Sequence, residues 1–171
     1  ELIRVHQPRA TIVVGGHISN MDGIDELLDA DHIVRGDGIA WFRHYLGQDV
    51  GCPVKHPAVV SAFDTKILGQ TLSSKPGDTA AIVVPSVGCP MGCNFCSTSA
   101  LFGGKGKFKN FYESGEELYG VMAGLEEKLK VSSFFILDEN FLLHRERALA
   151  LLEQMKKDNK SWALYVFSSA R

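Results

Sequence analysis

Three cysteines lie within eight residues, in the run Cys89-Pro-Met-Gly-Cys93-Asn-Phe-Cys96. Thiolates are the usual ligands of iron–sulfur clusters, and a tight turn at Pro90 and Gly92 would let the three sulfurs face one centre. A cubane normally takes four cysteines, so three would leave one iron open to a small molecule. Structural zinc normally takes four N or S ligands, and no paired CxxC or nearby His completes that set. The run favours a [4Fe–4S] cluster over zinc or over three unligated cysteines.

Polar residues also follow two predicted strands further along the chain. They are Asp138, Glu139 and Asn140 after residues 133–137, and Ser168, Ser169 and Arg171 after residues 163–167. The carboxyl ends of parallel strands carry the chemistry of α/β barrels, where a carboxylate can pair with a cation and Arg can bind a carboxylate. The alternatives are a charge at the start of the next helix and an exposed chain end.

The elements that would position these residues follow an α/β pattern. The apolar runs 10–14 and 80–85 are typical of strands buried on both faces of a parallel sheet. Amphipathic helices are predicted over 118–129, after a capping box at Ser114–Glu117, and over 144–157. Together with strands 80–85, 133–137 and 163–167 they make three βα units of about 30 residues each. Such units open a parallel α/β barrel or an open sheet.

The amino-terminal region has the same alternation on a smaller scale. Strands are expected at 10–14 and 32–35 and helices at 22–28 and 41–46, with Gly15 and Gly16 closing the first strand. Two strands cannot complete a doubly wound domain. Residues 48–79 are rich in Pro and Gly without periodicity, which predicts a linker with one short strand. The expected divisions are 1–47, 48–79 and 80–171.

Composition excludes several classes of protein. The chain has 171 residues, 45% hydrophobic and 22% charged, and its 18 basic and 20 acidic side chains give a net charge of −2. This balance gives no footprint for nucleic acid, and no apolar run approaches the ~20 residues of a membrane span. No signal peptide is recognisable, and both ends look cut from a longer protein. A cysteine cluster without a secretion signal indicates a reducing, cytoplasmic location.

The cysteine run after a buried strand, with Phe95 before the third Cys, resembles the signature of the radical S-adenosylmethionine (SAM) superfamily over about residues 80–171. The resemblance implies that Cys89, Cys93 and Cys96 hold a [4Fe–4S] cluster whose open iron is chelated by SAM. It implies that the reduced cluster cleaves SAM to a 5′-deoxyadenosyl radical, with flavodoxin or ferredoxin as electron donor. It also assigns the SAM-binding residues: the Phe95 backbone to the adenine, Asp138, Glu139 and Asn140 to the ammonium, and Ser168, Ser169 and Arg171 to the carboxylate.

The residues from Val13 to Gly38, with Gly15 and Gly16, are similar to the later half of the flavodoxin-like cobalamin-binding domain that precedes many radical SAM cores. In that domain the glycine pair lets the backbone approach the nucleotide tail of cobalamin. The DxHxxG motif that carries the family's cobalt ligand is absent here, so His17 is expected to be a loop residue. The implied fold is the C-terminal part of that domain followed by the first three βα units of a partial (β/α) radical SAM barrel.

The implied function is that of one segment of a longer enzyme, inactive alone, whose parent is a cobalamin-dependent methyltransferase or related radical enzyme acting on a small molecule or peptide. The rivals are a radical SAM protein that has lost its cobalamin and an iron–sulfur or electron-transfer module without SAM chemistry. The sequence assigns no catalytic side chain. The basic run Gly103–Lys107 lacks the phosphate-loop pattern and is expected to be a connector, and Cys52 a bystander thiol.

Overall fold

The computed structural model describes residues 2–53, 59–60, 65–67, 70–72, 80–98 and 105–169. It divides into two compact units, Glu1–Cys52 with Gly88–Phe108, and Pro53–Val87 with Lys109–Arg171. Each unit combines helices with a parallel strand pairing, which confirms the predicted mixed α/β class. Among the described residues the sheets are open, with no barrel closure. No helix in this part of the chain combines the length and apolar character needed to cross a membrane.

The first unit is built around two short parallel strands, β1 (Val13–Val14) and β2 (His32–Ile33). Its helices are α1 (Leu2–His6), η1 (His17–Asn20), α2 (Ile24–Leu27) and α3 (Gly38–Tyr45). The strands are shorter than the predicted 10–14 and 32–35. At one end Asp31 accepts a hydrogen bond from the Ile12 amide (2.7 Å), and at the other Gly16 and Gly36 take left-handed φ angles of 78° and 85°. These features end the regular pairing early.

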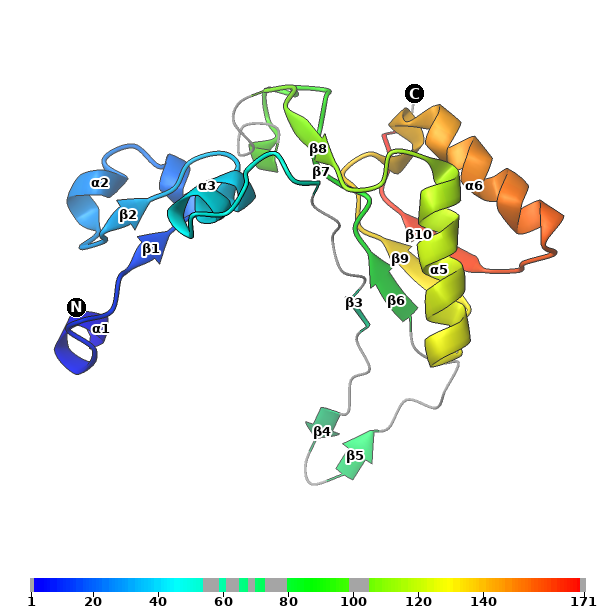
Figure 1. Ribbon diagram of the computed structural model, residues 1–171, viewed down its shortest axis with the longest axis horizontal. Coiled ribbons are helices and arrows are strands. Elements are labelled where there is room, and N and C mark those ends of the chain that lie inside the picture. Colours follow the sequence, from blue (N-terminus) through cyan, green and yellow to red (C-terminus); the bar gives the residue numbers. More distant parts are fainter. Residues whose placement is uncertain are drawn as a thin grey trace. The chain divides into compact units, whose positions relative to one another are not determined.

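The second unit contains a four-stranded sheet in the order β10-β9-β6-β3 (Figure 1). The strands are β6 (Ala80–Val83), β9 (Ser133–Ile136) and β10 (Ala163–Val166), all parallel, and β3 (Val59–Val60), which is antiparallel to β6. Helix α5 (Gly115–Leu129) connects β6 to β9 by way of a second small sheet, and η2 (Phe141–Leu143) and α6 (Arg145–Lys157) connect β9 to β10. The carboxyl ends of three parallel strands therefore lie at one edge of the sheet.

Residues 48–79 contain more strand than the sequence predicted. Besides β3, the strands β4 (Thr65–Ile67) and β5 (Gln70–Leu72) form an antiparallel pair. Strands of two or three residues are too short to show a hydrophobic period, so the expectation of one strand in this region was wrong. Following β6, β7 (Ser86–Gly88) pairs with β8 (Phe108–Asn110), and Gly88 is required there because a Cβ would lie 2.5 Å from the Lys107 carbonyl oxygen.

The β6–β9 pair of the main sheet is fully buried on one face only. Ala81 and Val83 of β6 are in register with Phe134 and Ile136 of β9, and all four are completely buried. The intervening residues, such as Ile82 and Phe135, are half-buried. The expectation that the run 80–85 is buried on both faces is therefore wrong for Ala80 and Ile82, which are half-buried. Right-handed crossovers that continue in one direction put both α5 and α6 on the same face.

The two long helices begin and pack as their sequences require. The Ser114 hydroxyl accepts a hydrogen bond from the Glu117 amide (3.1 Å), and the Glu117 carboxylate accepts one from the Glu113 amide (3.0 Å), which confirms the predicted cap. Gly115 then touches α6, since a Cβ there would lie 2.4 Å from both the Arg147 carbonyl oxygen and the Leu151 nitrogen. Leu118 and Met122 of α5 and Leu151 of α6 are fully buried and form the core beneath the sheet.

Candidate functional site

A polar cluster joins the carboxyl ends of the three parallel strands in the second unit. We call it the strand-end cluster; it consists of Ser86, Asp138, Asn140, Arg147, Ser168 and Ser169. The Asp138 side chain is only 2% exposed. One of its carboxylate oxygens accepts hydrogen bonds from the Ser86 hydroxyl and from the Arg147 guanidinium, both 2.6 Å long. The other accepts a hydrogen bond from the Asn140 backbone amide (2.9 Å), so both carboxylate oxygens of Asp138 are hydrogen-bonded within the protein.

Asn140 extends the cluster from β9 to β10. Its side-chain oxygen accepts hydrogen bonds from the Ser168 hydroxyl (3.1 Å) and the Ser169 amide (3.2 Å). Its side-chain nitrogen donates to the Ser169 hydroxyl (3.1 Å). The Phe141 backbone amide also donates a hydrogen bond to the Phe167 carbonyl oxygen (3.0 Å). The turns that follow β9 and β10 are therefore fixed to one another.

The sequence-predicted residues of this edge differ in their access to solvent. Glu139, Ser168 and Ser169 are exposed, whereas Asp138 and Asn140 are buried. Glu139 is thus the exposed carboxylate of the predicted acidic segment. Arg171 lies outside the described residues.

Arg147, on α6, is the central donor of the cluster, and its side chain is 3% exposed. Besides Asp138 it bonds the Tyr112 carbonyl oxygen (3.3 Å) and the Asn110 side chain (3.5 Å), and its guanidinium carbon lies 5.6 Å from the centre of the Phe141 ring. Its Nε is the one buried side-chain N or O atom, among the described residues, without a hydrogen-bond partner. An unsatisfied buried donor costs about 1–3 kcal/mol, so this arrangement is not optimised for stability alone.

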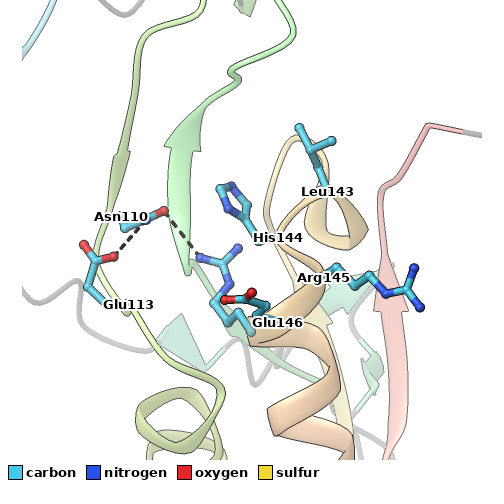
Figure 2. A pocket seen from close by; sticks show the side chains of 7 residues that line it. Asn110, Glu113, Leu143, His144, Arg145 and Glu146 are labelled. Carbon is cyan, nitrogen blue, oxygen red and sulfur yellow. Dashed lines mark hydrogen bonds between the residues drawn. The ribbon is translucent and has the colours of Figure 1, made fainter.

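A pocket of about 420 Å³ lies beside the cluster and has polar walls. It is lined by Asn110, Glu113, Leu143, His144, Arg145, Glu146 and Arg147. Figure 2 shows the His144 ring facing Asn110, while the Arg145 side chain extends away from them. Burial, followed by the positive charge of Arg147, lowers the pKa of His144 below its usual 6.5, although Asp138 and Glu113 oppose the shift. The neutral imidazole is therefore favoured at this position.

The three clustered cysteines lie directly after β7, in the first unit. None of the three forms a disulfide; Cys89 is buried, and Cys93 and Cys96 are half-buried. The segment turns at Gly92, which has a φ of 62°, and the Cys96 amide donates to the Cys93 carbonyl oxygen (3.2 Å). Phe95 is 93% exposed. Among the described side chains, no group of three or more His, Cys, Asp or Glu is arranged to hold a metal ion, so the thiols are near in sequence without forming a preassembled site.

The glycine pair of the first unit lines a second pocket, of about 360 Å³. Its walls are Val13, Gly15, Gly16, Val34, Gly36, Gly38 and Phe42, and they are mainly apolar. The pocket is at the carboxyl ends of β1 and β2, the edge at which open α/β sheets bind ligands. Gly15 and Gly16 therefore lie where backbone can approach a bound molecule, whereas His17 begins η1 and is exposed.

Two members of the strand-end cluster, Arg147 and Ser86, were missed by sequence reasoning. Arg147 lies four and eight residues before Leu151 and Met155, on the buried stripe of α6. A charged residue on an apolar stripe was a usable signal, because a buried charge needs a partner. Ser86 gave no comparable signal beyond its place after a buried strand.

Comparison of the chain with protein-family models, with curated proteins and with solved structures gave no match.

Proposed function

We propose that this chain is a segment of a radical SAM enzyme, in which Cys89, Cys93 and Cys96 ligate a [4Fe–4S] cluster and SAM binds to its open iron. The observation that carries the proposal is the set of three cysteines, none of them in a disulfide, in a turn that directly follows a β-strand. In the resembled family a cluster held in this way, once reduced, supplies the electron that cleaves SAM to a 5′-deoxyadenosyl radical. Flavodoxin or ferredoxin is the proposed electron donor.

The donor set fits such a cluster in kind. Three thiols are the soft ligands that iron–sulfur clusters take, and the residues around them include no carboxylate that would favour a harder ion. The thiols are not gathered in advance, which is compatible with a site that is organised by its metal, because binding and local folding are coupled. Phe95, the residue of the proposed adenine contact, is exposed.

At the strand ends, Glu139 is the proposed partner of the SAM ammonium. It is an exposed carboxylate next to two buried residues that fix the turn, so it can meet a cation at a defined place. Ser168 and Ser169, held by Asn140, and Arg171 remain the proposed contacts of the SAM carboxylate.

For residues 1–47 we propose the C-terminal part of a flavodoxin-like cobalamin-binding domain. The glycine-lined apolar pocket at the strand ends supports this, since a backbone without side chains admits a bulky ligand closely. Residues 80–171, which include the three cysteines, would then be the first three βα units of a (β/α) radical SAM barrel. The parent protein would be a cobalamin-dependent methyltransferase or related enzyme acting on a small molecule or peptide.

The test begins with anaerobic reconstitution of the chain with iron and sulfide. We expect a brown, oxygen-sensitive species with about four irons per chain. Cys93→Ala should abolish it, whereas Cys52→Ala, which removes an exposed thiol elsewhere, should leave iron content unchanged. Equal losses from both variants would contradict the ligand assignment.

Addition of SAM separates the proposed enzyme from an electron-transfer module. Only an open iron can accept a new ligand, so SAM should change the electron paramagnetic resonance spectrum of the reduced cluster. A full cluster whose spectrum is indifferent to SAM would favour the iron–sulfur module without SAM chemistry.

A further inference from the structure

The Asp138–Arg147 pair connects four separate parts of the second unit. Asp138 follows β9 and accepts from Ser86, which is 52 residues away, in β7. Arg147 reaches the Tyr112 carbonyl oxygen after β8 and stacks near Phe141 of η2. Through the Asn140 amide the carboxylate also sets the turn that holds Ser168 and Ser169.

The chemistry of the pair favours a role in geometry. Replacing a buried ion pair with apolar side chains is often neutral or stabilising, so such a pair is weak evidence for stability by itself. Here the pair also leaves the Arg147 Nε without a partner. The pair instead fixes the 138–140 turn. Arg147 holds the Asp138 carboxylate, and that carboxylate accepts a hydrogen bond from the Asn140 backbone amide, with the backbone of Glu139 between them.

We propose that Arg147, with Ser86, is a positioning residue for SAM: by holding Asp138 it fixes the 138–140 turn so that Glu139 meets the SAM ammonium, and Asp138 itself makes no contact with SAM. This inference rests on the proposed function. In this proposal the buried Asp138 carboxylate orients the turn, and the exposed Glu139 carboxylate binds the SAM ammonium.

The experiment measures SAM affinity by anaerobic equilibrium dialysis of the reconstituted chain, with iron content and unfolding temperature determined for each sample. Glu139→Gln should weaken SAM binding about tenfold and leave iron content unchanged, because it removes the charge that faces the SAM ammonium and replaces none of the three cysteines. Arg147→Met should weaken it by a similar factor. The double variant should bind SAM no more weakly than Arg147→Met, since Glu139 is already misplaced.

If Arg147→Met does not fold, Ser86→Ala takes its place as the test variant. It removes one hydrogen bond to Asp138, keeps the ion pair, and should lower SAM affinity by about threefold to fivefold while speeding amide hydrogen exchange at Asn140. Ser133→Ala, at the opposite end of β9, is its matched control and should change neither quantity.

Three results would overturn the inference. The first is SAM affinity within twofold of the unaltered chain in every one of Arg147→Met and Ser86→Ala that folds, which would make the pair merely structural. The second is a double variant, Glu139→Gln with Arg147→Met, whose fold-loss of SAM affinity equals the product of the fold-losses of the two single variants. The third is weaker SAM binding in Asp138→Asn together with tighter SAM binding in Arg147→Met, which would show that Asp138 binds SAM directly. Absence of SAM binding to the unaltered reconstituted chain is a different result, since it refutes the proposed function itself.

Discussion

His144 shows at the residue scale how the neighbourhood of the strand-end cluster changes an ordinary side chain. Burial and then Arg147 lower its pKa, so between its folded pKa and 6.5 the folded chain binds fewer protons than the unfolded chain. Stability therefore rises with pH across that window. The contribution of His144 is fully present above 6.5 and is lost as the pH falls through the folded pKa.

His144→Gln should remove this part of the pH dependence. We expect the unfolding temperature of the unaltered chain to fall more steeply than that of the variant when the pH is lowered from above 6.5 to below it. Asp138, Glu113 and Arg147, which face the imidazole, are unchanged in both proteins, so the difference between the two curves reports His144. Parallel curves would contradict the pKa direction.

At the element scale, the contact of α5 with α6 depends on Gly115. Its backbone lies against the Arg147 carbonyl oxygen and the Leu151 nitrogen, and neither backbone atom can move aside cheaply. Gly115→Ala should therefore lower the free energy of unfolding by about 1–3 kcal/mol, as overpacking does. Denaturant titration measures this value.

Gly124→Ala is the matched control in the same helix. No atom lies within 4 Å of its would-be Cβ, so the substitution should raise stability by up to about 1 kcal/mol through helix propensity. If both variants changed stability in the same direction, the close approach of the two helices at Gly115 would be wrong.

At the scale of the whole molecule, β10 is an open edge of the main sheet within the described residues. Within the described residues β10 pairs only with β9, and Tyr165 and Phe167 are 56% and 53% exposed. An apolar edge strand with unpaired backbone groups is a template for another strand. We expect the chain to associate as its concentration rises, as measured by light scattering after size exclusion.

Tyr165→Lys should reduce that association, because charges on edge strands oppose pairing. Ser161→Lys adds the same charge at an exposed position just before β10 and should have little effect. Equal suppression by both variants would point to net charge rather than to the edge.

The sequence by itself determined the features that depend on near neighbours. The apolar stripe from Leu118 to Leu129 and the cap at Ser114 predicted α5, because helix packing and capping repeat over three or four residues. The order of strands and long helices in the second unit followed from the same local patterns. The cysteine spacing and the glycine pair are also local patterns, and the proposed function rests on them.

Only the tertiary structure decided which polar residues meet and which faces are covered. Asp138 and Glu139 are adjacent acids in the sequence, yet one is buried against Arg147 and Ser86 and the other is exposed. The sheet is covered on one face because both crossover helices lie there. These outcomes depend on contacts between distant parts of the chain, and the energy of a buried charge depends on a partner that no local pattern names.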